Sequence, residues 1–347
     1  MSRELIDKIA RAVLYEGYIL YPYRPSVKSQ QRWTFGGLYP QTWTDAQRAG
    51  DPSLMQTECL FAGPGSGSVR INVRFLHLIN RTVGKLLNST DDFKLVDSLC
   101  VGDVKYYPWQ EAADRDVDAG TYQIDHLLSG PREMRFGFPA MRMLEPLRET
   151  DGTAVGMLIR EQQAVEARAG ISAAQLEDGL FKINVTIGNL TPMDVAATPD
   201  RDNALMRTLI STHAILAVRG GEFVSLTDPP AQWKRFAASC QNIGNWPVLV
   251  GTEPDRGTIL ASPIILYDYP QIAPESPGDL FDATEIDEIL SLRILTLTDD
   301  EKRAAAGVDG KTREMMARTE SLAREQLMGL HGTMRGMQPV AQEQSHG

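Results

Sequence analysis

Cysteine is scarce in this sequence: three residues in 347, Cys59, Cys100 and Cys240, with no CxxC pair. An odd and sparse set of this kind fits a reducing cytosol and small buried thiols. It argues against a structural zinc or an iron–sulfur centre held by this chain alone. We therefore expect a cytoplasmic protein with no metal and no cofactor.

Long apolar runs and positive charge are also lacking. No run approaches the roughly 18 apolar residues of a membrane span, so we expect no membrane insertion. The N-terminus MSRELIDKIARAV contains acidic residues early, which excludes a secretory signal. The chain has 35 basic and 45 acidic residues, so its net charge is −10. General binding of nucleic acid needs a cationic surface, so no nucleic acid is expected as a partner.

Catalytic motifs are absent as well. The sequence has no GxSxG, GxGxxG, Walker loop or HExxH. The glycine-rich run GPGSGS at 63–68 lacks the lysine and the preceding strand of a phosphate cradle, so we expect an ordinary loop there. Cys240 falls on the apolar face of an expected helix, which does not suit a nucleophile. The sequence favours a protein that is not an enzyme.

Aromatic side chains, by contrast, are concentrated near the N-terminus. The segment 15–43 holds eight of the chain's Tyr, Phe and Trp residues, and three cations lie among them. One interpretation is a core plug whose tyrosine hydroxyls reach the surface. The other is an aromatic-walled surface for a partner or a ligand, because Tyr and Trp combine large area with a polar group. The candidate partner-binding residues are Tyr21, Tyr23, Arg24, Trp33, Phe35 and Tyr39.

Hydrophobic periodicity predicts the elements. Helical spacing of apolar residues indicates a helix over 2–16, and strict alternation indicates strands over 68–80 and within 179–192, where Pro192 ends the pairing. His77 falls on the apolar side of the first strand, and we expect a core residue. Further expectations are a loop over 44–67, a charged loop over 111–120, a short helix over 204–211, a hairpin around Gly220-Gly221, a helix over 229–241, and strands near 246–251 and 259–270. The segment 155–170 is compatible with a helix by its Gln and Ala content, but the turn before it and the strand after it favour a strand.

Together these elements predict an α+β fold, mainly of antiparallel, sandwich-like sheets with an N-terminal helix and a C-terminal helical segment. We divide the chain into an aromatic-rich β region over 1–150 and a second β-rich region over 151–283, packed on the first. A helical segment over 284–335 and a disordered tail over 336–347 complete the prediction.

Acidic residues gather in the loop 275–288. Asp279, Asp282 and Glu285 form a candidate site there, since oxygen-rich groups suit hard cations or general acid–base chemistry. A simpler role is open too. Asp282 can cap the following helix, and Glu285 three residues later can complete a capping box.

Two long stretches resemble a known family: AVLYEGYILYPYRPSVKSQQRWTFGGLYP at 12–40 and SPIILYDYPQIAPESPGDLFDATEIDEILSLRILTLTDDEK at 262–302. With the weaker FKINVTIGNLTP at 181–192, they are similar to conserved hypothetical proteins encoded in bacterial [NiFe] hydrogenase gene clusters of the actinobacterial, high-affinity type. The resemblance implies an accessory or maturation factor and supplies no catalytic residues. The chain lacks the CxxC pairs and His-rich tracts of nickel chaperones and the nucleotide motif of the maturation GTPase, so any role in metal insertion is indirect.

Two functional hypotheses follow. The first is a non-enzymatic accessory protein that binds a hydrogenase subunit or a maturation protein. The alternative is an enzyme, or a protein that binds a small ligand or metal, using the acidic loop 275–288 with the N-terminal aromatics. Carboxylates that converge with aromatics in a concave pocket favour the alternative. Carboxylates used as helix caps beside an apolar patch favour the first.

Overall fold

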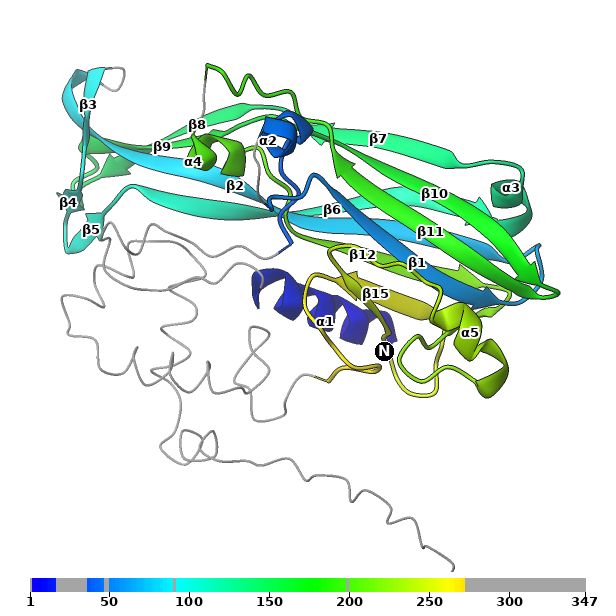
Figure 1. Ribbon diagram of the computed structural model, residues 1–347. Coiled ribbons are helices and arrows are strands. Elements are labelled where there is room, and N and C mark those ends of the chain that lie inside the picture. Colours follow the sequence, from blue (N-terminus) through cyan, green and yellow to red (C-terminus); the bar gives the residue numbers. More distant parts are fainter. Residues whose placement is uncertain (1, 17–35, 47–49, 90–91, 198–199, 272–347) are drawn as a thin grey trace, which may run out of the picture.

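The computed structural model describes residues 2–16, 36–46, 50–89, 92–197 and 200–271. This part of the chain is mostly antiparallel β-sheet, arranged in two main sheets (Figure 1). The first has five strands in the order β13 (Glu222–Val224), β1 (Leu54–Ala62), β11 (Leu180–Asn189), β10 (Val165–Glu177) and β7 (Arg132–Phe138). All of its pairings are antiparallel, and only β10 and β11 are consecutive strands of the chain.

The second sheet has eight strands and is organised around one long strand, β2 (Ser68–Ser89). Its main path runs β14 (Trp246–Leu249), β15 (Thr258–Ser262), β12 (Ile210–Arg219), β2, β9 (Ala154–Gln162) and β8 (Met141–Arg148). Strands β3 (Asp92–Val96) and β6 (Trp109–Gln123) also pair with β2. A separate ribbon pairs β4 (Leu99–Val101) with β5 (Val104–Tyr106).

Helices are short apart from the first. They are α1 (Ser2–Glu16), α2 (Gln41–Ala46), α3 (Ile124–Leu128), α4 (Arg201–Leu205) and α5 (Lys234–Ala237), with a 3₁₀ turn over Ala231–Trp233. The apolar side of α1, including Ile9 and Val13, packs on Ile215 and Leu260 at the outer face of the eight-stranded sheet. No helix within the described ranges is long and apolar enough to cross a membrane.

The main core lies where the two sheets face each other. Alternate side chains of β2 (Val69, Ile71, Val73 and Phe75) and of β11 (Ile183, Val185 and Ile187) belong to one buried cluster. Alternation in a strand puts every second side chain on one face, so each sheet buries one face against the other. Strands from residues 54–148 and from residues 154–262 occur in both sheets, and both ranges contribute to this cluster.

Beyond the core, the second half of β2 continues with β3, β8 and β9 past the end of the five-stranded sheet (Figure 1). We call this extension, residues 80–109 and 141–162, the arm. The arm has its own small core, in which Val83, Val101, Leu147 and Leu158 are buried. The β4–β5 ribbon contributes to that core through Val101, Leu99 and Tyr106.

Several expectations are confirmed. The helix over 2–16 and the strands over 68–80 and 179–192 are present, the latter as β11 over Leu180–Asn189. The single strand predicted over 155–170 is instead the end of one strand and the start of another, β9 and β10, which are separated at residues 163–164. Asp151-Gly152 turns the chain between β8 and β9. His77 is fully buried and belongs to the interior, as predicted.

Other predicted elements are present but shifted or shorter. The short helix expected over 204–211 lies earlier in the chain, at α4, and the helix expected over 229–241 is reduced to a 3₁₀ turn and α5. The segments 246–251 and 259–270 form strands only over β14 and β15.

The two predicted loops over 44–67 and 111–120 are wrong. In the first, residues 44–46 belong to α2 and residues 54–62 to β1, whose buried Glu58 accepts hydrogen bonds from Lys182 and Gln241, whereas 63–67 form a loop as expected. The second is the body of β6, where Asp116 and Asp118 pair with Arg74 and Arg70 on β2. Polar composition therefore misled the prediction, because cross-strand ion pairs let a charged sequence form a strand.

The predicted hairpin at Gly220-Gly221 is also wrong. β12 pairs with β2 and β15, whereas β13 pairs with β1 in the other sheet, so these glycines carry the chain from one sheet to the other. Gly221 is needed because a Cβ there would lie 2.4 Å from Cζ of Phe61 and 2.6 Å from the carbonyl oxygen of Ala62. The predicted C-terminal helical segment and tail lie outside the described residues.

Candidate functional site

Most residues of the two predicted sites lie outside the described part of the chain. These are Tyr21, Tyr23, Arg24, Trp33 and Phe35 of the aromatic segment, and Asp279, Asp282 and Glu285 of the acidic loop. Their convergence into one site stays a prediction.

Tyr39 is the one candidate aromatic that the structure places. Its side chain is 2% exposed and packs in a small core with Trp43 and Leu76. Its hydroxyl oxygen accepts a hydrogen bond from Nη2 of Arg201 at 2.6 Å, and the same guanidinium lies 5.2 Å from the ring centre. Arg201 also pairs with Asp51, which accepts from the indole of Trp43. At Tyr39 and Trp43 the aromatic segment is therefore a core plug with satisfied polar groups.

Exposed apolar side chains gather on the arm instead. Of the eleven large apolar side chains that are exposed in the described ranges, six lie there: Leu87, Leu95, Val104, Met141, Met143 and Leu144. Three of these six belong to β8, which is the last strand of its sheet among the described strands. β8 therefore combines an open backbone edge with apolar side chains in solvent, which is the usual character of a docking edge.

The segment that forms this edge is basic in an acidic protein. Residues 132–148, which comprise β7, a short link and β8, contain four Arg and two Glu, a local charge of +2. β7 is itself the last strand of the five-stranded sheet, so one continuous segment borders both sheets. Neither Arg132 nor Arg148 has a carboxylate partner within the described ranges; both donate to backbone carbonyls. The charge on this border is available to an acidic partner.

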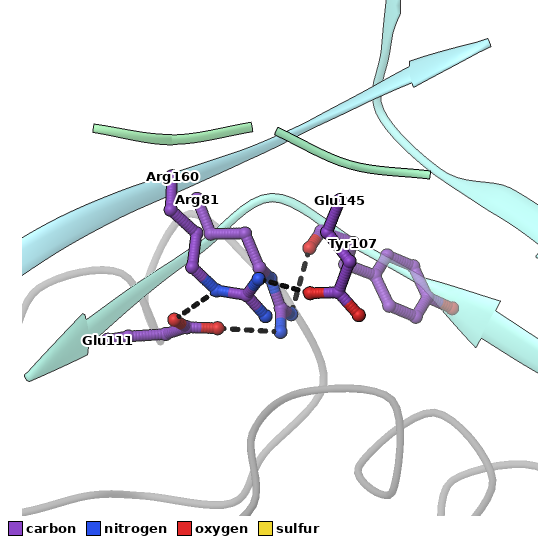
Figure 2. A network of polar contacts seen from close by, with 5 residues as sticks. All are labelled: Arg81, Tyr107, Glu111, Glu145 and Arg160. Carbon is purple, nitrogen blue, oxygen red and sulfur yellow. Dashed lines mark hydrogen bonds and ion pairs between the residues drawn. The ribbon is translucent and has the colours of Figure 1, made fainter. Parts of the chain in front are cut away.

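A network of arginines and glutamates holds β8 on the arm (Figure 2). Arg81 on β2 and Arg160 on β9 are direct cross-strand partners and would repel each other. Glu111 on β6 lies between them: Oε1 accepts from Arg81 Nη1 at 3.0 Å, and Oε2 accepts from Arg160 Nε at 2.7 Å.

The network extends to β8 and to the loop before β6. Arg160 Nη1 also donates to Glu145 of β8 at 2.5 Å, and Arg81 Nη2 donates to the carbonyl oxygen of Tyr107 at 3.1 Å (Figure 2). Arg81 is 3% exposed, so its charge is stabilised by protein groups and not by water. Four separate segments are joined at one point, which fixes the position of the β8 edge.

A polar pocket lies on the opposite face of the same strands. In register, Asn80 of β2 faces Gln110 of β6 on one side and Glu161 of β9 on the other. This row of three forms the floor, and α4 with its preceding residue forms a wall. The pocket has a volume of about 310 Å³ and is lined by Asn80, Gln110, Glu161, Gln163, Asp200, Asp202, Asn203 and Met206. It was not foreseen, because its members come from four distant segments.

Two cysteines and two histidines elsewhere in the described chain have pKa values that burial shifts away from reactivity at neutral pH. Burial, with help from Cys240 and Glu58, raises the pKa of the Cys59 thiol far above its ordinary value, and burial raises the pKa of Cys240 to about 11. Burial also lowers the pKa values of His77 and His213 to about 4, so both imidazoles are neutral at pH 7. Within the described ranges, no three His, Cys, Asp or Glu side chains are grouped to hold a metal. These four groups do not support nucleophilic or acid–base chemistry.

Comparison with known proteins adds no assignment. No protein-family model matches the chain. The search of curated proteins gives no match either.

Proposed function

We propose that this protein is a non-enzymatic accessory factor of the cytoplasm that binds a hydrogenase subunit or a maturation protein during [NiFe] hydrogenase assembly. The proposal that the protein binds another polypeptide rests on β8, an open edge strand with exposed apolar side chains and basic neighbours. The partner class comes from the resemblance of residues 12–40 and 262–302 to proteins encoded beside such hydrogenases.

The edge suits an extended polypeptide. A strand at the end of a sheet has backbone N–H and C=O groups that can pair with a further strand, and alternate side chains then give specificity. Met141 and Met143 share one face of β8, and Met side chains adapt to varied partners. Because Pro146 has no N–H, pairing is restricted to the part of β8 that precedes it.

Charge selects the partner segment. The border segment 132–148 carries +2, whereas the free side of the sheet at β6 is rich in carboxylates, with Glu111, Asp114, Asp116 and Asp118 against Arg115. The carboxylates along β6 would repel an acidic segment, so β6 does not compete with β8 for such a partner. We therefore propose that the occupant of β8 is an extended segment with alternating apolar and acidic side chains.

The test is an affinity pull-down of the tagged protein from hydrogenase-producing cells, with hydrogenase and maturation proteins quantified by mass spectrometry. Met143 is 46% exposed, so charged substitutions there are compatible with folding. We expect Met143→Asp to reduce recovery at least about tenfold, because a carboxylate would face an acidic segment. Met143→Lys should retain most of the recovery, since its charge has the favourable sign.

Leu128→Asp is the matched control. Leu128 lies in α3, far from β8 (Figure 1), and its exposed fraction of 39% is similar. Recovery from this variant should equal that of the unmodified protein. The proposal fails if the folded protein recovers no hydrogenase or maturation protein. It also fails if Asp and Lys at position 143 act alike, or if Leu128→Asp loses as much as Met143→Asp.

A further inference from the structure

We propose that the polar pocket between α4 and the β6–β2–β9 strands is a binding site for a small organic cation, an alkyl compound with ammonium groups. The pocket lies on the face of the sheet opposite Met141 and Met143, and β8 contributes no lining residue, although its Arg142 pairs with Glu161 of the floor.

The floor of the pocket is built by strand register. The side chains of Gln110, Asn80 and Glu161 form one row across three paired strands, about 10 Å from end to end at the usual strand spacing. The volume of about 310 Å³ lies at the lower end of the range for ligand pockets, roughly 300–1,000 Å³. A small metabolite fits these dimensions.

The wall is held in place by buried and charged neighbours. His77, which is fully buried, contacts the carbonyl oxygen of Gln163 through Nε2 at 2.9 Å. Arg207 donates to the side-chain oxygen of Gln163 at 2.9 Å and to the carbonyl oxygen of Asn203 at 3.1 Å. Two lining residues are thus oriented before any ligand arrives, which lowers the entropic cost of binding.

The chemistry of the lining selects a cation. Three carboxylates, four side-chain amides and one thioether line the pocket, and no lining residue is cationic. Arg207 is already engaged with Gln163 and Asn203, and the Arg142–Glu161 pair at 3.2 Å is half exposed and therefore weak. Ammonium groups can donate to the carboxylates and to the amide oxygens. The thioether of Met206 offers an apolar contact for the alkyl part.

An organic cation fits better than a metal ion. Among the described residues no three metal-ligating side chains are close enough to share an ion, and the carboxylates here are spread over β9 and the start of α4. Asp200 also uses Oδ1 to accept from the backbone N–H of Asp202, as the cap of α4. Separated carboxylates match a ligand whose donors are separated by a short alkyl chain.

The test is isothermal titration of the full-length protein with 1,4-diaminobutane, with 1,4-butanediol as its neutral counterpart of the same length. We expect saturable binding of the diamine at a single site and none of the diol. Glu161→Gln and Asp202→Asn should each weaken the diamine affinity at least about tenfold, because each removes a charged hydrogen-bond acceptor.

Asp178→Asn provides the control, since Asp178 is an exposed carboxylate in the turn between β10 and β11. It removes the same charge from the protein and should leave the affinity unchanged. The inference is overturned if the diamine does not saturate, if the diol binds equally, or if Asp178→Asn weakens binding as much as the pocket variants. Thermal unfolding of each variant verifies that a lost affinity is not a lost fold.

Discussion

Glu111→Ala is expected to lower the free energy of unfolding by about 3–5 kcal/mol, the usual cost of removing one partner from a buried ion pair. The reason is the geometry of Figure 2. Without this carboxylate, Arg81 and Arg160 remain opposite each other on paired strands, and Arg81 has almost no access to water. Chemical denaturation measures the change.

Asp118→Ala is the matched control for that experiment. It breaks another arginine–carboxylate pair between the same two strands, β2 and β6, but Arg70 and Asp118 are 45% and 53% exposed. An exposed pair contributes about 1 kcal/mol or less. Equal losses in the two variants would contradict the assignment of Glu111 as the buried bridge. Replacing Arg81, Glu111 and Arg160 together by apolar residues should recover part of the loss, because the one charge left unpaired, Glu145, is 54% exposed to water.

Phe61→Ala is expected to cost about 3–5 kcal/mol as well, by leaving a cavity between the sheets. Phe61 is fully buried, and its ring centre lies 6.2 Å from that of Phe181. Around the ring tip, Gly63, Gly67 and Gly221 approach so closely that a Cβ on any of them would lie under 3.0 Å from Cζ. These three glycines have no side chains that could move in to fill the space.

Leu87→Ala is the control for Phe61→Ala in the same denaturation assay. Leu87 is 57% exposed on the arm, and its truncation should change stability by about 0.5 kcal/mol or less. A loss below about 1 kcal/mol for Phe61→Ala would contradict the packing described here. Gly221→Ala gives a second check. It should destabilise the unmodified protein, and it should cost less in the Phe61→Ala background, where the ring is gone.

The strands with strict alternation could be predicted because one of their faces is buried. In β2, Val69, Ile71 and Val73 enter the core while Arg70 and Arg74 stay outside, so the period of two is visible in the sequence. β6 hides its strand character, because its outer carboxylates are matched by those arginines on a neighbouring strand about forty residues away. The local composition of β6 does not show that its carboxylates have arginine partners on another strand.

The docking edge and the pocket escaped prediction for related reasons. β8 is exposed on nearly all of its length, so Met141 to Leu144 show no inward period. The one local feature of the sequence that points to the β8 edge is the set of arginines interleaved with Met and Phe over 132–147. Glu111 is 30 residues from Arg81 and 49 from Arg160, and the pocket draws on four segments. Contacts of this range are set by strand pairing, which a single sequence does not reveal.

The most direct measurement of the central claim is site-specific photo-crosslinking in hydrogenase-producing cells. A photoreactive phenylalanine analogue replaces Met143 in the β8 edge, and in a parallel strain it replaces Leu128 in α3. We expect position 143 to form a covalent adduct with a hydrogenase subunit or maturation protein, and the crosslinked peptide to be an acidic, apolar segment. Position 128 should form no such adduct. Absence of an adduct at 143 in a folded protein, or the same adduct at both positions, would contradict docking at β8.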